Sequence, residues 1–199
     1  MDEPEAVLWA SVFADGPGGG NPCPVVLGDG LRPVARRRRG PELTDQWVLA
    51  ALRLTASALG DGPIQPVSTA RAKLMVPLRD EEVLDRLEPD LPLLWQVCDE
   101  LDVTGFYPFS RTASGVAARQ FPLRAGYPED PATDIAACAL GAYLTVRSGA
   151  DPVPGWNRFS VRQGRAMGRP SRMPAETHVA TDGTITATRV GGHLRPATR

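Results

Sequence analysis

The chain has 199 residues, of which 42% are hydrophobic and 23% are charged, enough to build the core of one or two compact domains. A formal net charge of −1 argues against binding of nucleic acid or an anionic membrane through bulk charge, so we expect neither partner. No run approaches the ~20 apolar residues of a membrane span, and the acidic N-terminus does not resemble a signal peptide, which favours a cytoplasmic protein.

The first 62 residues are poorly patterned and contain several breaks. We expect strands over Ala6–Ala14 and Pro24–Leu27, separated by the glycine-rich turn that ends at Asn21-Pro22. The stretch from Gly28 to Pro41 includes four consecutive arginines and lacks apolar periodicity, which predicts a solvated loop. A short helix over Thr44–Leu54 and a linker over Gly60–Pro66 follow.

The second part of the chain is rich in strands. Helical spacing of apolar residues predicts two helices, Asp80–Leu87 and Leu91–Leu101. The Asp182-Gly183 pair predicts a tight hairpin before the last strand. The predicted strands are Lys73–Leu78, Gly105–Ser110, Val116–Leu123, Arg158–Gln163, Ala166–Arg172, Thr177–Ala180 and Thr184–Val190.

An acidic, proline-containing turn leads into a third helix, predicted over Ala132–Val146. Asp130 is placed as its cap and Pro131 in its first turn, where the missing N–H costs nothing. The helix is made almost entirely of small and apolar residues, so other structure must enclose it. We therefore predict an α+β fold in which a curled, mostly antiparallel sheet wraps around this central helix. The helix N-terminus, with the N–H groups of Thr133–Ala136, then forms a sheltered site for an anion.

Three segments point to a known family. The first is Val12-Phe13-Ala14-Asp15 followed by Gly19–Leu27. The second is Arg119-Gln120-Phe121-Pro122 followed by Glu129–Thr133, and the third is Gln163-Gly164 followed by Gly168–Ser171. Together they resemble the phenazine-biosynthesis isomerase (PhzF-like) family, which shares the diaminopimelate epimerase fold. The resemblance covers the first ~28 residues and the chain from about Pro63 onwards, where order and spacing agree.

The resemblance implies an organisation in two units. Family members have two pseudo-symmetric domains, with the active site in the cleft between two helix N-termini. Here we expect a reduced N-terminal remnant over residues 1–62, completed by a C-terminal strand within 184–199, and a sheet-around-helix domain over residues 63–183. The resemblance also implies that Thr184–Arg195 pairs with Ala6–Ala14. The remnant lacks a central helix of its own, so its apolar sheet face would be partly uncovered, and we expect self-association, as a homodimer or a larger oligomer.

The sequence departs from the family pattern at two places. Family members carry a Ser-Glu-Thr segment, whose glutamate is the principal general acid/base, and a Cys-Gly-His-Ala-Thr-like segment that opens the first enclosed helix. Neither segment is found in this sequence. The second departure follows Thr133, where Asp134 and Ile135 stand in place of the family's glycine and serine.

The resemblance assigns one catalytic residue, Asp130, and a set of substrate-binding residues: Gly20, Asn21, Thr133, Asp134 and Ile135. Asp130 has two compatible roles, a helix cap and a proton carrier whose pKa rises if the cleft is dry. Asp134 either weakens the anion site by its charge or acts as a second capping residue. Asn21 either binds substrate or only stabilises its turn.

Two functions of different classes follow. The first is an isomerase or epimerase that moves protons on a small carboxylate metabolite in biosynthesis, as in secondary metabolism. It would use no metal and no organic cofactor, in keeping with only two histidines and three cysteines without metal-type or redox-type spacing. The second is a catalytically inactive, truncated family member that binds a ligand or a protein partner. The missing glutamate favours the second function, whereas the intact Glu129–Thr133 turn favours a retained site.

Overall fold

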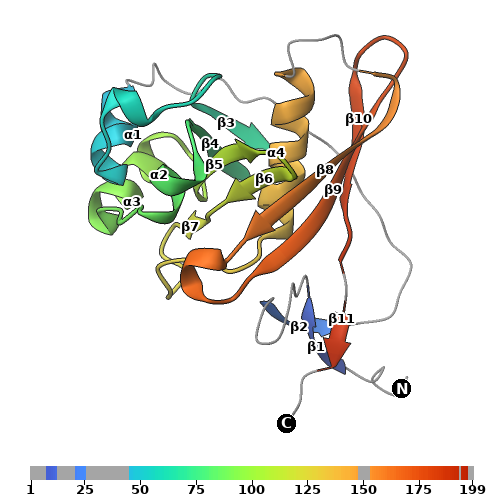
Figure 1. The fold of residues 1–199 in the computed structure, drawn as a ribbon, viewed down its shortest axis with the longest axis horizontal. Coiled ribbons are helices and arrows are strands. Elements are labelled where there is room, and N and C mark those ends of the chain that lie inside the picture. Colours follow the sequence, from blue (N-terminus) through green and yellow to red (C-terminus); the bar gives the residue numbers. More distant parts are fainter. Residues whose placement is uncertain (1–7, 13–20, 26–44, 148–152, 193, 197–199) are drawn as a thin grey trace.

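An eight-stranded sheet curls around one helix, α4 (Asp134–Val146), in the computed structural model (Figure 1). The structure describes residues 8–12, 21–25, 45–147, 153–192 and 194–196. The order of the main strands is β10-β9-β8-β6-β5-β4-β3, and the short β7 pairs with β5. Their bounds are β3 Gln65–Ser68, β4 Ala72–Leu78, β5 Gly105–Thr112, β6 Gly115–Ala118, β7 Phe121–Pro122, β8 Gly155–Gln163, β9 Ser171–Val179 and β10 Ile185–Val190.

The sheet is mixed but mostly antiparallel, so the expected fold class is confirmed. Only β4 with β5 and β6 with β8 pair in parallel. Helix α4 is buried from Ala136 to Thr145, because the small side chains along it let the curled sheet approach closely. A Cβ added to Gly141 would lie 3.0 Å from Thr177 Oγ1 on β9. The composition that predicted an enclosed helix is therefore also what fits it into the sheet.

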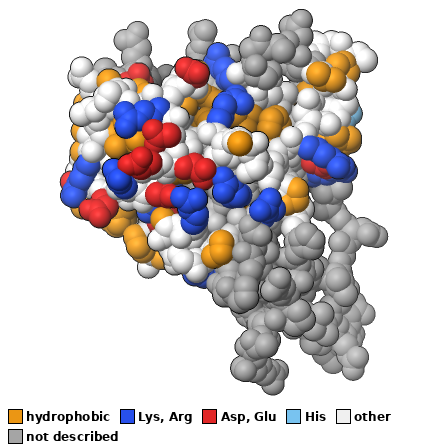
Figure 2. All heavy atoms as spheres, in the orientation of Figure 1, with side chains coloured by type: hydrophobic (Ala, Val, Ile, Leu, Met, Phe, Trp, Pro, Cys, Tyr) orange, Lys and Arg blue, Asp and Glu red, His pale blue; other side chains and the backbone are white. Residues whose placement is uncertain are grey.

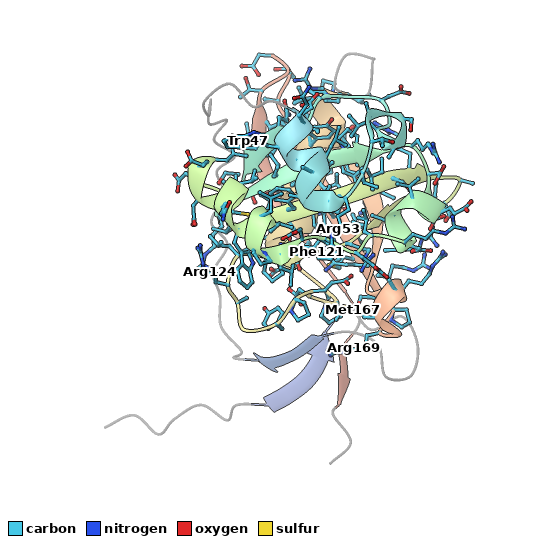
Figure 3. All side chains as sticks on the ribbon, turned by 90° about the vertical axis from the view of Figure 1, so that its left-hand side faces the viewer. Trp47, Arg53, Phe121, Arg124, Met167 and Arg169 are labelled. Atoms are coloured by element: carbon cyan, nitrogen blue, oxygen red, sulfur yellow. The ribbon has the colours of Figure 1, made fainter. Side chains whose placement is uncertain are left out.

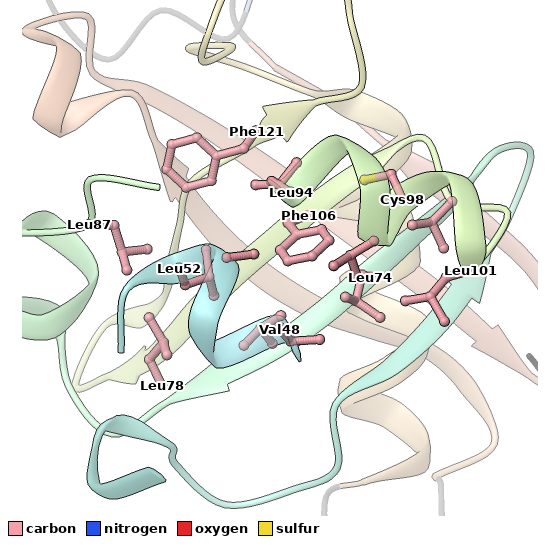
Figure 4. Close-up of a cluster of buried hydrophobic side chains, with 14 of the residues drawn as sticks. Val48, Leu52, Leu74, Leu78, Leu87, Leu94, Cys98, Leu101, Phe106 and Phe121 are labelled. Atoms are coloured by element: carbon pink, nitrogen blue, oxygen red, sulfur yellow. The ribbon is translucent and has the colours of Figure 1, made fainter. Parts of the chain in front are cut away.

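A second helical layer covers the opposite face of β4 and β5. It consists of α1 (Asp45–Leu52), α2 (Glu81–Asp85) and α3 (Leu91–Glu100). Side chains alternate between the two layers, as strand geometry requires. Leu74 packs with these helices (Figure 4), and so does Val76, whereas Met75 belongs to the core around α4. The layer gives β4 and β5 two buried faces, so a side chain on either face is removed from water.

Two of the covering helices start at aspartate caps. The side chain of Asp80 accepts a hydrogen bond from Val83 N at 2.8 Å, and that of Asp90 accepts one from Leu93 N at 3.2 Å. Acidic and basic side chains are interspersed over the face of the molecule seen in Figure 2, in keeping with the net charge near zero. Within the described ranges, no helix combines the length and apolarity needed to cross a bilayer.

Several element boundaries differ from the sequence prediction. The predicted strand Val116–Leu123 is interrupted between β6 and β7, although both pieces pair with β5 in one register. The interruption faces Pro108, which has no N–H to donate. The predicted strand Ala166–Arg172 is wrong: a 3-10 turn, Arg165–Met167, occupies its first part, and β9 starts at Ser171. The linker was placed too far along the chain, because Gln65 and Pro66 already belong to β3.

The strands nearest the two ends of the chain form a separate three-stranded sheet in the order β11-β1-β2 (Figure 1). The strands are β1 Leu8–Val12, β2 Asn21–Val25 and β11 Leu194–Pro196. The expectation that Thr184–Arg195 pairs with Ala6–Ala14 is confirmed only at its C-terminal end, where Leu194 and Arg195 pair with Val12 and Ser11. Residues 185–190 pair with β9 instead, and only β11 pairs with β1, with Ala10 opposite Pro196. The predicted loop from Gly28 to Pro41 lies outside the described residues.

Candidate functional site

The bend before α4 holds Asp130 by its backbone and its side chain. Asp130 N donates to Gln120 O at 3.0 Å, which attaches the bend to the edge of the sheet. The Asp130 carboxyl accepts hydrogen bonds from Thr133 Oγ1 at 2.7 Å and from Ala132 N at 3.5 Å. The placement of Asp130 as helix cap and Pro131 in the first turn is wrong, because α4 begins at Asp134 and Thr133 is its N-cap. Asp130 therefore caps the bend and not the helix.

A buried amide and a phenol fix this arrangement from the other side. Gln163, at the end of β8, donates through Nε2 to Asp130 O at 2.6 Å and to Thr133 Oγ1 at 3.1 Å. Tyr107 on β5 donates to Gln163 Oε1 at 2.8 Å. Gln163 and Tyr107 are both buried. The carboxyl at the helix tip is therefore held by groups that are themselves fixed, which is the preorganisation expected of a reactive site.

Burial governs the electrostatics of the Asp130 carboxyl. Asp130 is only 8% exposed, and the loss of hydration raises the pKa of its carboxyl above the ordinary value. The hydrogen bond from Thr133 and the positive charge of Lys73 oppose this rise, whereas the charge of Asp134 adds to it. A carboxyl with a raised pKa exchanges its proton closer to neutral pH, as a general acid or base must.

Asp134 and Ile135 lie at the same helix tip but are more exposed to solvent than Asp130. Asp134 is exposed, and its carboxylate accepts a hydrogen bond from Ile135 N at 2.7 Å. The backbone of Asp134 does not have a positive φ, so no strain accompanies the replacement of the family's glycine. Asp134 therefore occupies one donor of the helix N-terminus and places a second negative charge beside Asp130.

The structure brings four of the six predicted site residues together: Asp130, Thr133, Asp134 and Ile135. Gly20 lies outside the described residues. Asn21 opens β2 opposite Val12, and its side chain is not among those described. The pairing of Asn21 with the helix tip across a cleft therefore stays a prediction.

Gln163 and Tyr107 were missed as site residues, although the sequence contained one signal. The pair Gln163-Gly164 was part of the quoted family resemblance. Gly164 has φ +77°, and a Cβ there would lie 2.2 Å from Arg169 O and 2.8 Å from Pro131 O. Met167 and Arg169 mark this turn in Figure 3. The glycine is thus required for contact between the turn after β8 and the bend that carries Asp130.

Arg119 and Glu129 support the bend as a buried ion pair. Arg119 Nε donates to Glu129 Oε1 at 2.9 Å, and Nη2 donates to Oε2 at 2.7 Å. The remaining Arg119 donor, Nη1, bonds three backbone carbonyls at the end of α2, those of Leu84, Asp85 and Leu87. The pair is bidentate, and every guanidinium nitrogen of Arg119 donates a hydrogen bond, which is the arrangement in which a buried ion pair is tolerated.

A small cavity of about 100 Å³ adjoins this network. It lies between α2 and the turn after β8, and Gln163 contributes to its wall. Its charged residues are mostly paired: Arg162 bonds Glu81 at 2.9 Å, and Arg165 bonds Asp85. Across the described part of the chain, no three His, Cys, Asp or Glu side chains gather as a metal site.

The sequence matches a family model and several isomerases. The family model described as phenazine biosynthesis-like protein (PhzC-PhzF) matches residues 31–195. An uncharacterized isomerase of Deinococcus radiodurans is 38% identical over 147 residues, which is 71% of this chain and 46% of that protein. The uncharacterized isomerase YddE of Escherichia coli O157:H7 is 34% identical over 125 residues, 61% of this chain and 42% of that protein. The chain thus spans less than half the length of these relatives.

Solved structures show the same fold. A predicted epimerase from Pseudomonas aeruginosa, 32% identical, superposes with a TM-score of 0.63 over 82% of this chain and 54% of that one. A phenazine biosynthesis protein of the PhzF family from Bacillus anthracis superposes with a TM-score of 0.70 over 83% of this chain and 56% of that one. The second is 20% identical, so its likeness concerns the fold alone.

Proposed function

The chain belongs to the phenazine biosynthesis-like (PhzC-PhzF) family, and we propose that it is an isomerase that moves a proton on a small carboxylate metabolite. The isomerase names of its relatives support this class of reaction. The observation that carries the proposal is the buried residue Asp130 beside the N-terminus of α4, whose carboxyl is bonded by Thr133 and whose backbone is bonded by Gln163.

In the proposed reaction, ionised Asp130 removes a proton from a substrate carbon next to a carbonyl or carboxylate group. The electron pair of the broken C–H bond delocalises into that group as an enolate-like anion. The dipole and free N–H groups of the α4 N-terminus stabilise the anion. In a substrate with a C=C double bond conjugated to that anion, protonated Asp130 then returns the proton to the far carbon of the double bond, which shifts the double bond and gives an isomer, and the carboxylate is restored. A return to the opposite face of the same carbon, which gives an epimer, requires a second proton carrier.

We also propose that the reaction needs no metal or organic cofactor and that it belongs to small-molecule biosynthesis in the cytoplasm. Gly20 and Asn21 face the helix tip and bind the substrate, together with Thr133, Asp134 and Ile135. Gly20 and Asn21 come from a reduced unit over residues 1–62, which is completed by part of 184–199. This unit stands opposite a second unit over residues 63–183.

Deuterium incorporation from D2O into a panel of small amino and keto acids tests the proposal. We expect the wild type to label at least one acid at carbon, and Asp130→Asn to lose 10²-fold or more of that rate, about the contribution of a general acid or base. Asp182→Asn, the same change in the exposed β9–β10 turn, should keep the wild-type rate. Equal exchange by wild type and Asp130→Asn would show that Asp130 is not the proton carrier.

A binding module without catalysis is the second candidate. It is favoured by one specific observation, the absence of sequence matching the Ser-Glu-Thr and Cys-Gly-His-Ala-Thr-like segments of the resembled family. Saturation-transfer NMR on the same panel of acids separates the two functions. Binding of an acid with no deuterium exchange by the wild type supports the module and contradicts the isomerase.

A further inference from the structure

The only lysine of the chain is buried inside it. Of 22 Lys and Arg residues, Lys73 alone is a lysine, and it is 7% exposed. Its Nζ donates to Thr104 O at 3.1 Å, and no salt bridge of Lys73 is found among the residues that the structure describes. A buried ammonium without a counter-ion is costly to the fold, so its position calls for an explanation.

Strand register places Lys73 on the side of the sheet that faces α4. In the parallel pair of β4 and β5, Leu74 is opposite Phe106, so Lys73 is beside Gly105. Met75 and Tyr107, the next residues on this face, both belong to the core around α4. In the register of β5 with β6 and β7, Gln120 follows as the neighbour of Tyr107, and Asp130 bridges to Gln120. Lys73 and Asp130 thus belong to the same region of the sheet.

The Gln120 side chain adjoins the peptide group that accepts the hydrogen bond of Lys73. Gln120 is 0% exposed, and a Cβ on Gly105 would come within 2.5 Å of its Nε2. The carbonyl that accepts Lys73 Nζ belongs to Thr104, in the peptide group that joins Thr104 to Gly105. The ammonium and the amide therefore adjoin the same peptide group. Neither polar atom of the amide has a hydrogen-bond partner in the described part of the chain.

We propose that Lys73 is a positioning residue whose charge favours the ionised, proton-accepting form of Asp130. Charges in an interior of low dielectric act over longer distances than in water, so the ammonium needs no direct contact with the carboxylate. Lysine suits this buried position because its ammonium is a compact point charge on an apolar stem. This inference rests on the proposed function of Asp130.

Other titratable groups act on both members of the pair. Burial lowers the pKa of Lys73 to about 8, while Asp130 and Asp134 raise it and Arg71 lowers it. The buried Cys98 thiol on α3 also raises the pKa of Lys73. For Asp130, the charge of Lys73 lowers the pKa and that of Asp134 raises it. Among the groups named here that act on Asp130, removal of Lys73 therefore leaves the negative charge of Asp134 and no positive charge.

The carboxyl titration of Asp130 tests the inference without any substrate. The ¹³C signal of Asp130, assigned by its loss in Asp130→Asn, is followed against pH in the wild type, Lys73→Met and Lys73→Arg. We expect the midpoint to move to higher pH in Lys73→Met and to return toward the wild-type value in Lys73→Arg. An unchanged midpoint in folded Lys73→Met overturns the proposal.

A reciprocal measurement keeps the test valid if Lys73→Met fails to fold. Because the chain has one lysine, ¹³C-lysine labelling gives a single Cε signal. Coupling between two sites is reciprocal, so Asp130→Asn should move the Lys73 midpoint to lower pH, whereas Asp182→Asn should not move it. Equal midpoints in Asp130→Asn and the wild type overturn the inference. Neither titration measures catalysis, so coupled titrations with no deuterium exchange would sink only the proposed function.

Discussion

The cost of burying the Lys73 ammonium makes stability depend on pH. The pKa of Lys73 falls from 10.5 to about 8 in the folded chain, so between these values the unfolded chain binds more protons than the folded one. Stability from this residue therefore increases from about pH 8 to pH 10.5, and the penalty is fully present below pH 8. A shift of this size corresponds to about 3 kcal/mol in order of magnitude.

We predict that Lys73→Met is more stable than the wild type at pH 7 by up to about 3 kcal/mol, because methionine keeps the buried stem and removes the charge. The difference should shrink toward zero as the pH approaches 10.5. Urea unfolding of both proteins at a series of pH values measures it, and the comparison cancels other titrating groups. A wild type that is the more stable of the two at pH 7 would contradict the prediction.

At the level of single residues, the sequence revealed the part of the site that is continuous along the chain. Asp130 and Thr133 are three residues apart in one bend, and the structure places them in contact. Lys73 and Tyr107 come from different strands and Gln120 from the break between β6 and β7, and sheet register alone brings them to one region, which no local pattern encodes. The one available signal for Lys73 was composition, a single lysine at the start of an apolar strand.

At the level of elements, the turn between β8 and β9 contains two glycines with left-handed backbones but different surroundings. Gly164 has φ +77° and meets the carbonyls of Arg169 and Pro131, whereas Gly168 has φ +67° and open space around it. An alanine at either position is strained by its backbone conformation. Only at Gly164 would the new methyl group also push the turn away from the bend that carries Asp130.

We predict that Gly168→Ala costs roughly 1 kcal/mol of stability, the strain of a left-handed residue alone. Gly164→Ala should cost at least about 2 kcal/mol, because overpacking against backbone adds to the strain. It should also shift the amide signals of Asp130 and Thr133, which Gly168→Ala should leave in place. Chemical denaturation and two-dimensional NMR make the comparison. Equal losses in the two variants would mean that contact with the bend does not matter.

These glycines also explain where element prediction failed. Strand-like residues from Ala166 to Arg172 suggested a strand, but the positive φ at Gly164 and Gly168 turns the chain into a 3-10 turn first. The enclosed helix was recognised from composition alone, since few arrangements bury ten consecutive helical residues. Its start was placed too early, because Pro131 also fits an extended bend, and only the pairing of Asp130 with Gln120 selects that conformation.

At the level of the whole molecule, the two sheets differ in how they are covered. The eight-stranded sheet has α4 on one face, and further helices cover β4 and β5 on the other. In the described part of the chain, β1 pairs with β2 and β11, and no helix packs extensively on these three strands. A sheet of three strands needs a packed face for stability. We propose that a second copy of the chain provides it.

We therefore predict self-association at micromolar concentration, with a mass by light scattering of at least twice the 21.3 kDa of one chain.

Ala10→Pro tests the role of the small sheet, because Ala10 in the central strand β1 is opposite both Cys23 and Pro196. Proline there removes an N–H from the ladder, so the variant should return to one chain mass. Its circular dichroism should stay close to that of the wild type, because the larger sheet is unaffected. A wild type that is monomeric at these concentrations contradicts the prediction, and an associated Ala10→Pro variant places the interface elsewhere.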